Sequence, residues 1–287
     1  MAVQSGADRP GADQPGRPVL LTGASGALGR VLAKGLAAAG WTLRLTDIVP
    51  FPDPLPTGAS FTRADLADGV AILQLAEGCG TILHFGGVSV ERPFSEVFQP
   101  NFLGLYHVYE AARRERARVV FASSNHTIGF YERDVRLDQD CQFRPDGYYG
   151  VSKAYGELMG RMYWDKHGVE NVNLRIGGSR PKVDDARTLA IYLSYADLLR
   201  LVIRATLAPR VGTLVIWGAS NNSRGFWGRD GRDVIGWAPA DSADPFIPEQ
   251  AANVSGNPVE ERYQGGRYCT IGYSRAEPSP REIFPPG

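Results

Sequence analysis

Two short stretches of the sequence hold the residues best suited to move a proton. Tyr149-Gly-Val-Ser-Lys153 opens a segment with helical apolar spacing, so Tyr149 and Lys153 are expected on one helix face, one turn apart. Ser123-Ser124-Asn125-His126 follows the apolar run Val119–Ala122, which is typical of a buried parallel strand. Ligand chemistry in open α/β sheets gathers at the carboxyl ends of strands. We therefore expect a hydroxyl, a phenol and an ammonium to converge there.

This set of groups suits the oxidation of an alcohol, which needs a base for the hydroxyl proton and a cationic acceptor for the hydride. A free tyrosine has a pKa near 10 and is a poor base at neutral pH. An ammonium and a cationic acceptor both favour the phenolate, and a shift of roughly three pKa units requires about 4 kcal/mol from the two charges. A water-poor cleft can supply that energy, whereas an exposed surface cannot. The prediction is that Tyr149 is the base and that Ser124 donates to the substrate oxygen.

A Tyr-x-x-x-Lys pair alone is more often a surface pair, so the prediction depends on a cofactor-binding half. The short strand Pro18–Thr22 leads into the glycine-rich turn Gly23–Gly29, and a helix follows from about Ala27 to Ala39. Such a turn presents backbone N–H groups to a pyrophosphate at a helix N-terminus. A simple tight turn is the alternative for a lone glycine triplet, but the flanking strand and helix favour a cofactor loop.

The next strand, Leu43–Asp47, indicates which dinucleotide the turn binds. It ends in a carboxylate 18 residues after Gly29. An acid at this position accepts both ribose hydroxyls of the adenosine and repels a 2′-phosphate. The predicted cofactor is therefore NAD in preference to NADP, with Lys153 holding the nicotinamide ribose.

Later strands add candidate cofactor contacts. A third strand, about Ser60 to Arg63, leads to Asp65, which either hydrogen-bonds the adenine or caps the next helix. The fourth strand, Thr81–Phe85, ends in two glycines that allow close approach of a ligand, and a helix follows from about Val97 to Arg116. The predicted cofactor-binding residues are Gly23, Ser25, Gly26, Ala27, Leu28, Asp47, Asp65, Leu66, Phe85, Gly86, Gly87, Asn101, Tyr149, Lys153 and Ile176.

Strands and helices alternate as far as Gly177, which predicts an α/β fold with a Rossmann-type doubly wound parallel sheet. We divide the chain into a disordered leader at residues 1–17, an NAD-binding Rossmann domain at 18–177, and a smaller C-terminal substrate-binding lobe at 178–287. The lobe contains a helix at about Tyr195 to Thr206 and a strand at Leu214–Trp217. It ends in an irregular, proline-rich arm to which the sequence assigns no role.

The composition excludes several classes of partner. The formal net charge is +0 and the pI is about 6.9, which argues against nucleic acid or an anionic membrane. No apolar run approaches the roughly 20 residues that span a bilayer, and no signal peptide is apparent. The 3 cysteines and 4 histidines lack ligand spacing, so no metal site is predicted and a reducing compartment, the cytoplasm, is expected. A homo-oligomer is compatible with the sequence.

Together these stretches resemble the extended short-chain dehydrogenase/reductase superfamily and, more narrowly, the uronate dehydrogenase family. The resemblance rests on Gly86–Phe94, Phe121–Gly129, Tyr149–Lys153 and Trp217–Ser220, and it covers about residues 18 to 238. It implies NAD-dependent oxidation of D-galacturonate or D-glucuronate, in the pyranose form, at C1 to the corresponding aldarolactone.

The resemblance also implies a set of substrate contacts. Arg187 would meet the substrate carboxylate, for which arginine offers a planar bidentate fork; the alternative is a loop arginine paired with Asp184 or Asp185. His126 is also a second candidate for proton transfer. The family has a serine where this chain has Gly178, so that contact is lost or passes to Ser179. The predicted substrate-binding residues are Ser89, Ser124, Asn125, His126, Tyr149, Gly178, Ser179 and Arg187.

Two rival functions remain open at this stage. A nucleotide-sugar epimerase or dehydratase shares the scaffold, but it keeps NAD bound and needs a large lobe for the nucleotide. The lobe of about 110 residues here is small for that purpose. A non-catalytic NAD-sensing protein belongs to a different class. Such proteins often lose the tyrosine or the lysine, and this chain has both.

Overall fold

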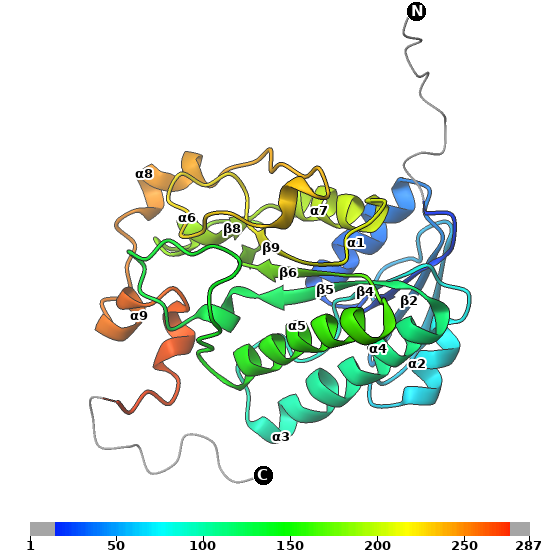
Figure 1. The fold of residues 1–287 in the computed structure, drawn as a ribbon. Helices are drawn as coiled ribbons and strands as arrows, with labels where there is room; N and C mark the ends of the chain where they lie inside the picture. The colour runs from blue at the N-terminus through cyan, green and yellow to red at the C-terminus, as the bar shows by residue number, and fades with distance from the viewer. Residues whose placement is uncertain (1–14, 276–287) are drawn as a thin grey trace, which may run out of the picture.

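Seven parallel strands form the central sheet in the order β3-β2-β1-β4-β5-β6-β9 (Figure 1). The computed structural model describes residues 15–275. The strands of the sheet are β1 (Val19–Thr22), β2 (Leu43–Asp47), β3 (Ala59–Arg63), β4 (Thr81–His84), β5 (Arg118–Ser124), β6 (Asn171–Ile176) and β9 (Thr213–Gly218). The strand order reverses between β1 and β4, which creates the crevice where ligands bind in such sheets. The predicted doubly wound parallel sheet is confirmed.

The helices of the described residues are α1 (Ala27–Ala38), α2 (Gly69–Ala76), α3 (Phe94–Val97), α4 (Gly104–Glu115), α5 (Tyr148–His167), α6 (Thr188–Ile191), α7 (Tyr195–Leu207), α8 (Ile247–Gln250) and α9 (Pro258–Arg262). A π-helix, η1 (Phe98–Leu103), joins α3 to α4, and the remaining turns are the 3₁₀ segments η2 (Asn125–Ile128), η3 (Gly231–Asp233), η4 (Asp244–Phe246) and η5 (Gly266–Thr270).

Helices cover both faces of the sheet. Helices α1 and α7 pack on one face through leucine and alanine side chains such as Leu32, Leu36, Leu198 and Leu201. Helices α2, α4 and α5 cover the other face, where Tyr109 is fully buried. Figure 1 shows the two layers above and below the strands. The central strands β1 and β4 are buried on both faces, which is why they are largely apolar.

Strand β9 and helix α7 lie beyond residue 177 but belong to the sheet and to its helical layer. The sequence predicted strand β9 but not its place in the sheet. In the structure β9 pairs with β6 at the edge of the sheet. The functional division at residue 177 stays a prediction. Of the predicted leader, residues 1–14 lie outside the described residues, whereas Arg17 donates to the carbonyl oxygens of Gly78 (3.1 Å) and Glu115 (3.2 Å).

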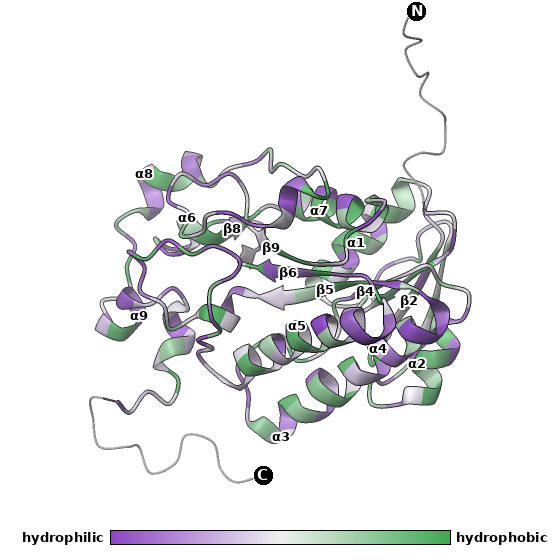
Figure 2. Cartoon of the chain, viewed as in Figure 1, coloured by the Kyte–Doolittle hydropathy of each residue, from purple (hydrophilic) through white to green (hydrophobic). Residues whose placement is uncertain are grey.

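The predicted helix from Val97 to Arg116 has a different form in the structure. The helical segment starts at Phe94 and passes through the π-helix η1 before α4. Pro100 lies in η1 and has no N–H for a helical hydrogen bond, which favours a local change of helix type. Arg116, with φ of 52°, ends α4 in the left-handed conformation. Figure 2 shows hydrophilic residues at this end of α4, which includes Arg113 and Arg114.

The C-terminal segment returns to the loop that follows β5. Glu132 forms an antiparallel bridge with Tyr263, and the Gly265 N–H donates to the Gly129 carbonyl oxygen at 2.8 Å. In Figure 1 the segment around α9 lies at the same end of the molecule as the carboxyl ends of β5 and β6. A second, two-stranded sheet of β7 (Gly178–Ser179) and β8 (Tyr192–Leu193) lies between β6 and α7 in the chain.

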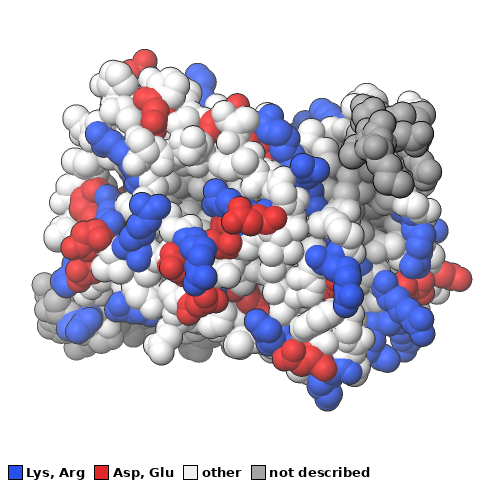
Figure 3. Space-filling view, turned by 45° about the horizontal axis from the view of Figure 1, so that its top comes forward, with Lys and Arg blue, Asp and Glu red and all other residues white. Residues whose placement is uncertain are grey.

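Surface charges of both signs are interspersed on the face shown in Figure 3, in keeping with the formal net charge of +0. Within residues 15–275 no helix has the length and apolar character needed to cross a bilayer. The same residues contain no cluster of three or more histidine, cysteine, aspartate or glutamate side chains that is suited to hold a metal ion.

Candidate active site

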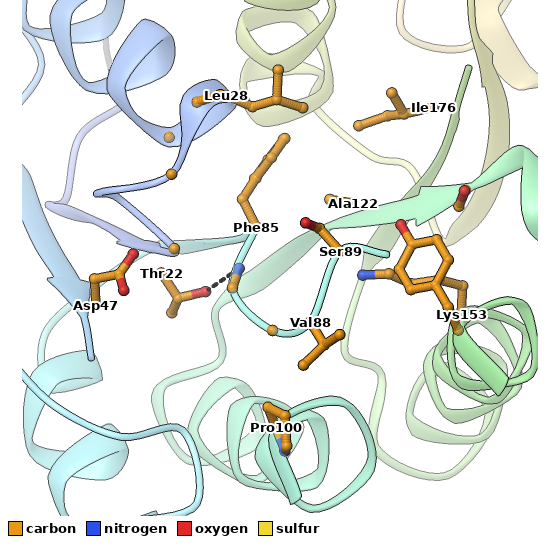
Figure 4. Close-up of a pocket in the computed structure, with 18 of the residues that line it drawn as sticks. Thr22, Leu28, Asp47, Phe85, Val88, Ser89, Pro100, Ala122, Lys153 and Ile176 are labelled. Atoms are coloured by element: carbon orange, nitrogen blue, oxygen red, sulfur yellow. Dashed lines mark hydrogen bonds between the residues drawn. The ribbon is translucent and has the colours of Figure 1, made fainter. Parts of the chain in front are cut away.

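A cavity of about 890 Å³ opens at the carboxyl ends of the strands. Asp47 at the end of β2 and Lys153 on α5 lie at opposite ends of it, with Phe85 and Ser89 between them (Figure 4). All predicted catalytic residues line the cavity, and so do the predicted cofactor and substrate residues except Asn101 and Arg187. Residues that the sequence predicted from separate segments therefore form one site in the structure. Asn101 and Arg187 lie just outside the cavity.

The glycine-rich turn fits a dinucleotide phosphate. Gly23 has φ of 70°, and a Cβ there would lie 2.5 Å from the Phe85 backbone. A Cβ at Gly29 would lie 2.1 Å from the Gly23 carbonyl oxygen, so this glycine lets α1 pack against the turn. Gly26 is exposed toward the cavity as the N-cap of α1 and gives the helix no side-chain cap. The helix N-terminus is thus free to bind an anion, as NAD requires.

Asp47 is oriented for an adenosine ribose. Its Oδ2 accepts from the Ser25 N–H at 3.0 Å and its Oδ1 from the Val49 N–H at 3.3 Å. Each oxygen retains a lone pair for a hydroxyl. The nearby cations Arg30 and Lys34 both pair with Asp53. A 2′-phosphate would face the Asp47 carboxylate without a free cation from α1, which agrees with NAD.

The structure shows where Asp65 and Asn101, two of the predicted cofactor-binding residues, lie. The residue that caps α2 is Asp68, whose Oδ1 accepts from the Ala71 N–H, so the cap alternative for Asp65 was wrong. Asp65 instead accepts from the Ala67 N–H in a tight turn at the cavity edge. Asn101 is buried in η1 and bonds both backbone groups of Val88, at 2.7 and 2.9 Å. It positions the loop after β4 from behind the cavity.

Tyr149, Lys153 and Ser124 meet as the sequence predicted. The Lys153 Nζ lies 5.5 Å from the centre of the Tyr149 ring, on the same face of α5. The Ser124 hydroxyl lies close enough to the Tyr149 phenol to act on its pKa. The neighbouring Ser123 points the other way and donates to Glu157 at 2.6 Å. Glu157 in turn forms a buried ion pair with Arg175 at 2.8 Å, which ties α5 to β5 and β6.

Burial disfavours the charged forms of both the Tyr149 phenol and the Lys153 ammonium. It raises the pKa of the Tyr149 phenol above its usual value of 10, although the Ser124 hydroxyl acts in the opposite direction. It lowers the pKa of Lys153 to about 8. At neutral pH a smaller fraction of the Tyr149 phenol is therefore ionised than in a free tyrosine. A positive charge beside it is needed to make it active, and NAD carries such a charge on its nicotinamide ring.

Glu91, which the sequence did not single out, caps the helix that carries Tyr149. Gly147 is the N-cap of α5 and has no side chain to offer. The Glu91 carboxylate accepts from the Tyr148 N–H at 2.8 Å and from the Tyr149 N–H at 2.9 Å. A Cβ at Gly147 would lie 2.3 Å from this carboxylate, so glycine allows the approach. Glu91 thus links the loop after β4 to the first turn of α5.

We predict that Glu91→Ala lowers kcat by about 10- to 100-fold, because a displacement of the reacting group by about 1 Å has an effect of this size. The lost cap should lower the free energy of unfolding by about 1 kcal/mol. Steady-state kinetics and thermal melts measure the two effects. Glu91→Gln keeps an acceptor oxygen and should retain most of the activity, whereas wild-type kcat in Glu91→Ala would exclude the positioning role.

His126 lines the cavity next to Tyr149. Its Nδ1 lies 2.6 Å from Oδ2 of Asp146, and its ring stacks on Tyr268 with a centroid distance of 4.0 Å and an interplanar angle of 15°. Tyr268 belongs to η5 in the C-terminal segment and also lines the cavity. The arm to which the sequence assigned no role therefore supplies part of the site wall.

Ser179 has the features of a ligand contact. Its Oγ is buried and has no hydrogen-bond partner among the described residues, and the residue lines the cavity. A Cβ at Gly178 would make ordinary contacts, the nearest at 3.5 Å to Thr188. The backbone at position 178 would thus accept the family serine, while the unpartnered hydroxyl is on Ser179.

Arg187 lies partly buried beside the cavity and is not paired with a carboxylate. Its Nε donates to the Gln264 carbonyl oxygen at 2.6 Å, and its Nη2 lies 2.8 Å from the Asn125 side-chain oxygen once that amide is oriented by its neighbours. No carboxylate of the described residues lies within 4.0 Å of the guanidinium, because Asp184 pairs with Arg180 and Asp185 accepts from the Thr188 N–H. Burial lowers the pKa of Arg187.

A charge that is partly buried and has no ion pair is costly, and such charges occur mainly where a ligand completes the pair. Asn125 lines the cavity and is in contact with the Arg187 guanidinium. Arg180 lines the cavity directly but is exposed and forms its ion pair with Asp184. Of these two arginines, Arg187 is the one without an ion pair within 4.0 Å among the described residues, although Asp146 and Asp185 are near enough to act on its charge.

The chain is similar to proteins of known activity. The sequence profile described as "NAD dependent epimerase/dehydratase family" matches residues 19–226. A uronate dehydrogenase of Pseudomonas putida is 43% identical over 262 residues, which cover 90% of this chain and 97% of the relative.

Solved structures give the same result. A mutant uronate dehydrogenase from Agrobacterium tumefaciens, complexed with NAD, is 42% identical with a TM-score of 0.84, covering 88% of this chain and 97% of that one. A glucuronic acid dehydrogenase from Chromohalobacter salexigens is 40% identical with a TM-score of 0.84, covering 89% and 97%.

Proposed function

The chain belongs to the NAD dependent epimerase/dehydratase family and, within it, to the uronate dehydrogenases, and we propose that its cavity oxidises a uronic acid at C1. It is an NAD-dependent oxidoreductase that acts on a CH–OH group. The observation that supports the choice of substrate best is Arg187, which has no ion pair and whose Nη2 contacts Asn125 in the wall of the cavity that Tyr149 and Lys153 line. A small sugar acid offers both the carboxylate and the hydroxyl that this arrangement needs.

Different residues of the chain bind different parts of NAD. The N-terminus of α1 at Gly26 faces the pyrophosphate, Asp47 accepts the adenosine ribose hydroxyls, and Lys153 holds the nicotinamide ribose. When bound, NAD supplies a cationic nicotinamide ring that accepts a hydride. The same charge and the Lys153 ammonium both favour the phenolate of Tyr149.

Tyr149 removes the proton from the anomeric hydroxyl while the C1 hydrogen leaves as a hydride. The C1–O bond becomes a carbonyl inside the closed pyranose ring, so the product is an aldarolactone and no water is consumed. Ser124 donates a hydrogen bond to the reacting oxygen and holds the phenol in place. Ser89, Asn125, His126 and Ser179 face the ring hydroxyls, and Arg187 binds the carboxylate at the other end.

The shifted pKa values of Tyr149 and Lys153 predict how kcat/KM depends on pH. The pKa of Tyr149 is raised, so the phenolate fraction, and with it kcat/KM, should rise with pH through the neutral range. Lys153, with its pKa lowered to about 8, loses its ammonium as pH rises through that value. The rise should therefore stop near pH 8. A profile of kcat/KM against pH that is flat below pH 8 would contradict this assignment.

A direct assay tests the proposed substrate. Full-length protein is mixed with NAD and with galacturonate, glucuronate or glucose, and NADH absorbance is followed. We expect NADH in proportion to product with both uronates and little with glucose. An absence of net NADH with either uronate, together with conversion of a nucleotide sugar, would favour the epimerase alternative.

Three further expectations are part of the proposal. We place the enzyme in the cytoplasm because Cys79, Cys141 and Cys269 are free thiols. The predicted substrate-binding lobe, residues 178–287, contributes Ser179 and Tyr268 to the wall that faces the substrate, with Arg187 next to that wall. Self-association would use the exposed aromatic side chains of α3, η1 and α5, such as Phe94, Phe98 and Tyr148.

A further inference from the structure

Asp146 makes an unusual contact behind the cavity wall. Its side chain is completely buried and does not line the cavity, and its Oδ2 lies 2.6 Å from the His126 Nδ1. A carboxylate offers only lone pairs, so the proton between the two atoms belongs to the imidazole. In neutral His126 the remaining nitrogen, Nε2, then carries a lone pair and no proton.

The fold builds a space for this carboxylate from distant segments. A Cβ at Gly129, in the loop after β5, would lie 1.9 Å from Oδ2, and a Cβ at Gly265, in the C-terminal segment, would lie 2.0 Å from it. Gly150, in the first turn of α5, is close to Oδ1, where a Cβ would lie at 3.2 Å. Side chains at the first two positions would displace Asp146, so the absence of side chains there keeps the carboxylate against His126.

The ring of His126 has little freedom to turn. Its own backbone N–H donates to the Ser124 Oγ at 3.2 Å, and its carbonyl oxygen accepts from the Asp146 N–H at 3.4 Å. Tyr268 stacks on one face of the ring, and Tyr149 approaches edge-on with a centroid distance of 5.8 Å. The ring plane and the direction of both nitrogens are therefore fixed before a substrate binds.

His126 lines the cavity, and its Nδ1 faces Asp146 behind the wall. Nε2 is the ring nitrogen left for a ligand, and the described residues provide no hydrogen-bond partner for it. A lone pair in this position requires an O–H donor. A sugar ring next to Tyr149 provides such a donor in the hydroxyl of a neighbouring carbon.

We propose that Asp146 is a positioning residue that holds His126 as the Nδ1–H tautomer, so that Nε2 accepts a hydrogen bond from a hydroxyl of the sugar substrate. This inference rests on the proposed function and deepens it. It makes His126 an acceptor that recognises one ring hydroxyl, and it leaves the proton transfer to Tyr149. A buried acceptor that meets no donor is costly, so sugars without this hydroxyl are rejected.

The tautomer can be measured directly in the full-length wild-type protein. Nitrogen-15 NMR of protein labelled at histidine separates protonated, pyrrole-type nitrogens from unprotonated, pyridine-type ones. The His126 signals are assigned by their loss in His126→Gln. We expect a protonated Nδ1 and an unprotonated Nε2 at pH 8. A protonated Nε2 would overturn the proposal, whether or not the enzyme oxidises uronates.

Kinetics test the consequence for substrate binding. Asp146→Ala removes the acceptor for the Nδ1 proton, so the imidazole proton is free to move to Nε2, and KM for galacturonate should rise by about 10- to 100-fold. The Kd for NAD should stay within about threefold of the wild-type value. Asp140→Ala, an exposed site in the same loop, is the control and should behave as wild type. A folded Asp146→Ala protein with wild-type KM would overturn the proposal, whereas failure of the wild type to oxidise any uronate would instead remove the proposed function.

Discussion

Tyr149→Phe should lower kcat by about 10³-fold or more while NAD still binds, because the substitution removes the proton acceptor and keeps the ring. General bases contribute factors of 10² to 10⁴, and the lone pair of the phenolate has no substitute on the same face of α5. The phenol interacts with the Ser124 hydroxyl, so the loss of stability should be no more than about 1 kcal/mol. Single-turnover kinetics measure the rate of the chemical step, and a fluorescence titration measures the Kd for NAD.

Tyr268→Phe is the matched control for this experiment. Tyr268 lines the same cavity, and its ring faces Tyr149 with a centroid distance of 6.3 Å. Its hydroxyl is assigned no proton transfer, so kcat should stay within about tenfold of the wild-type value. If Tyr149→Phe retained near-normal kcat, or if Tyr268→Phe caused the larger loss, Tyr149 would not be the base.

Arg187→Met is expected to raise KM for both uronates by about 100-fold, with a smaller effect on kcat. The substitution keeps an apolar stem of similar length and removes the charge. Loss of a charge-assisted pair with a carboxylate costs about 3 kcal/mol, which corresponds to about 100-fold in affinity. The variant should also lose most of its preference for uronates over neutral hexoses. Initial rates over a range of each sugar, at saturating NAD, measure both effects.

Arg180→Met separates this role from a general effect of positive charge. Arg180 lines the cavity, but it is exposed and already paired with Asp184 at 2.6 Å. Its removal should change KM by less than about threefold, because exposed ion pairs contribute little. A large rise in KM for Arg180→Met, with an unchanged KM for Arg187→Met, would place the carboxylate site at the outer rim.

Local patterns in the sequence were sufficient to predict the cofactor half. The glycine turn at Gly23–Gly29, the acid at Asp47 and the pair of Tyr149 and Lys153 each depend on residues close in sequence, since strand ends and helix periodicity fix them. The predicted strands therefore match the observed ones to within one or two residues. The π-helix at Pro100 was not predicted, because the periodicity of the following helix gave no sign of the extra turn.

Contacts between distant segments could not be predicted. Asp146 reaches His126 across a loop of 20 residues, and Tyr268 arrives from a segment without apolar periodicity. Glu91 caps a helix that starts more than 50 residues later. Arg187 was predicted from a resemblance, but its place behind Asn125 depends on how the 3₁₀ turn η2 folds against the C-terminal segment. Each of these contacts is set by packing in three dimensions, which a single sequence does not reveal.

The central claim is that Tyr149 takes the proton of the hydroxyl on C1 of a uronate while a cationic nicotinamide takes the hydride from C1 itself. Galacturonate with deuterium at C1 tests it in one experiment, read by mass spectrometry of NADH and product. We predict one deuterium on the nicotinamide of each NADH and an equal amount of aldarolactone. Unlabelled NADH, or consumption of galacturonate with no net NADH, would contradict the account.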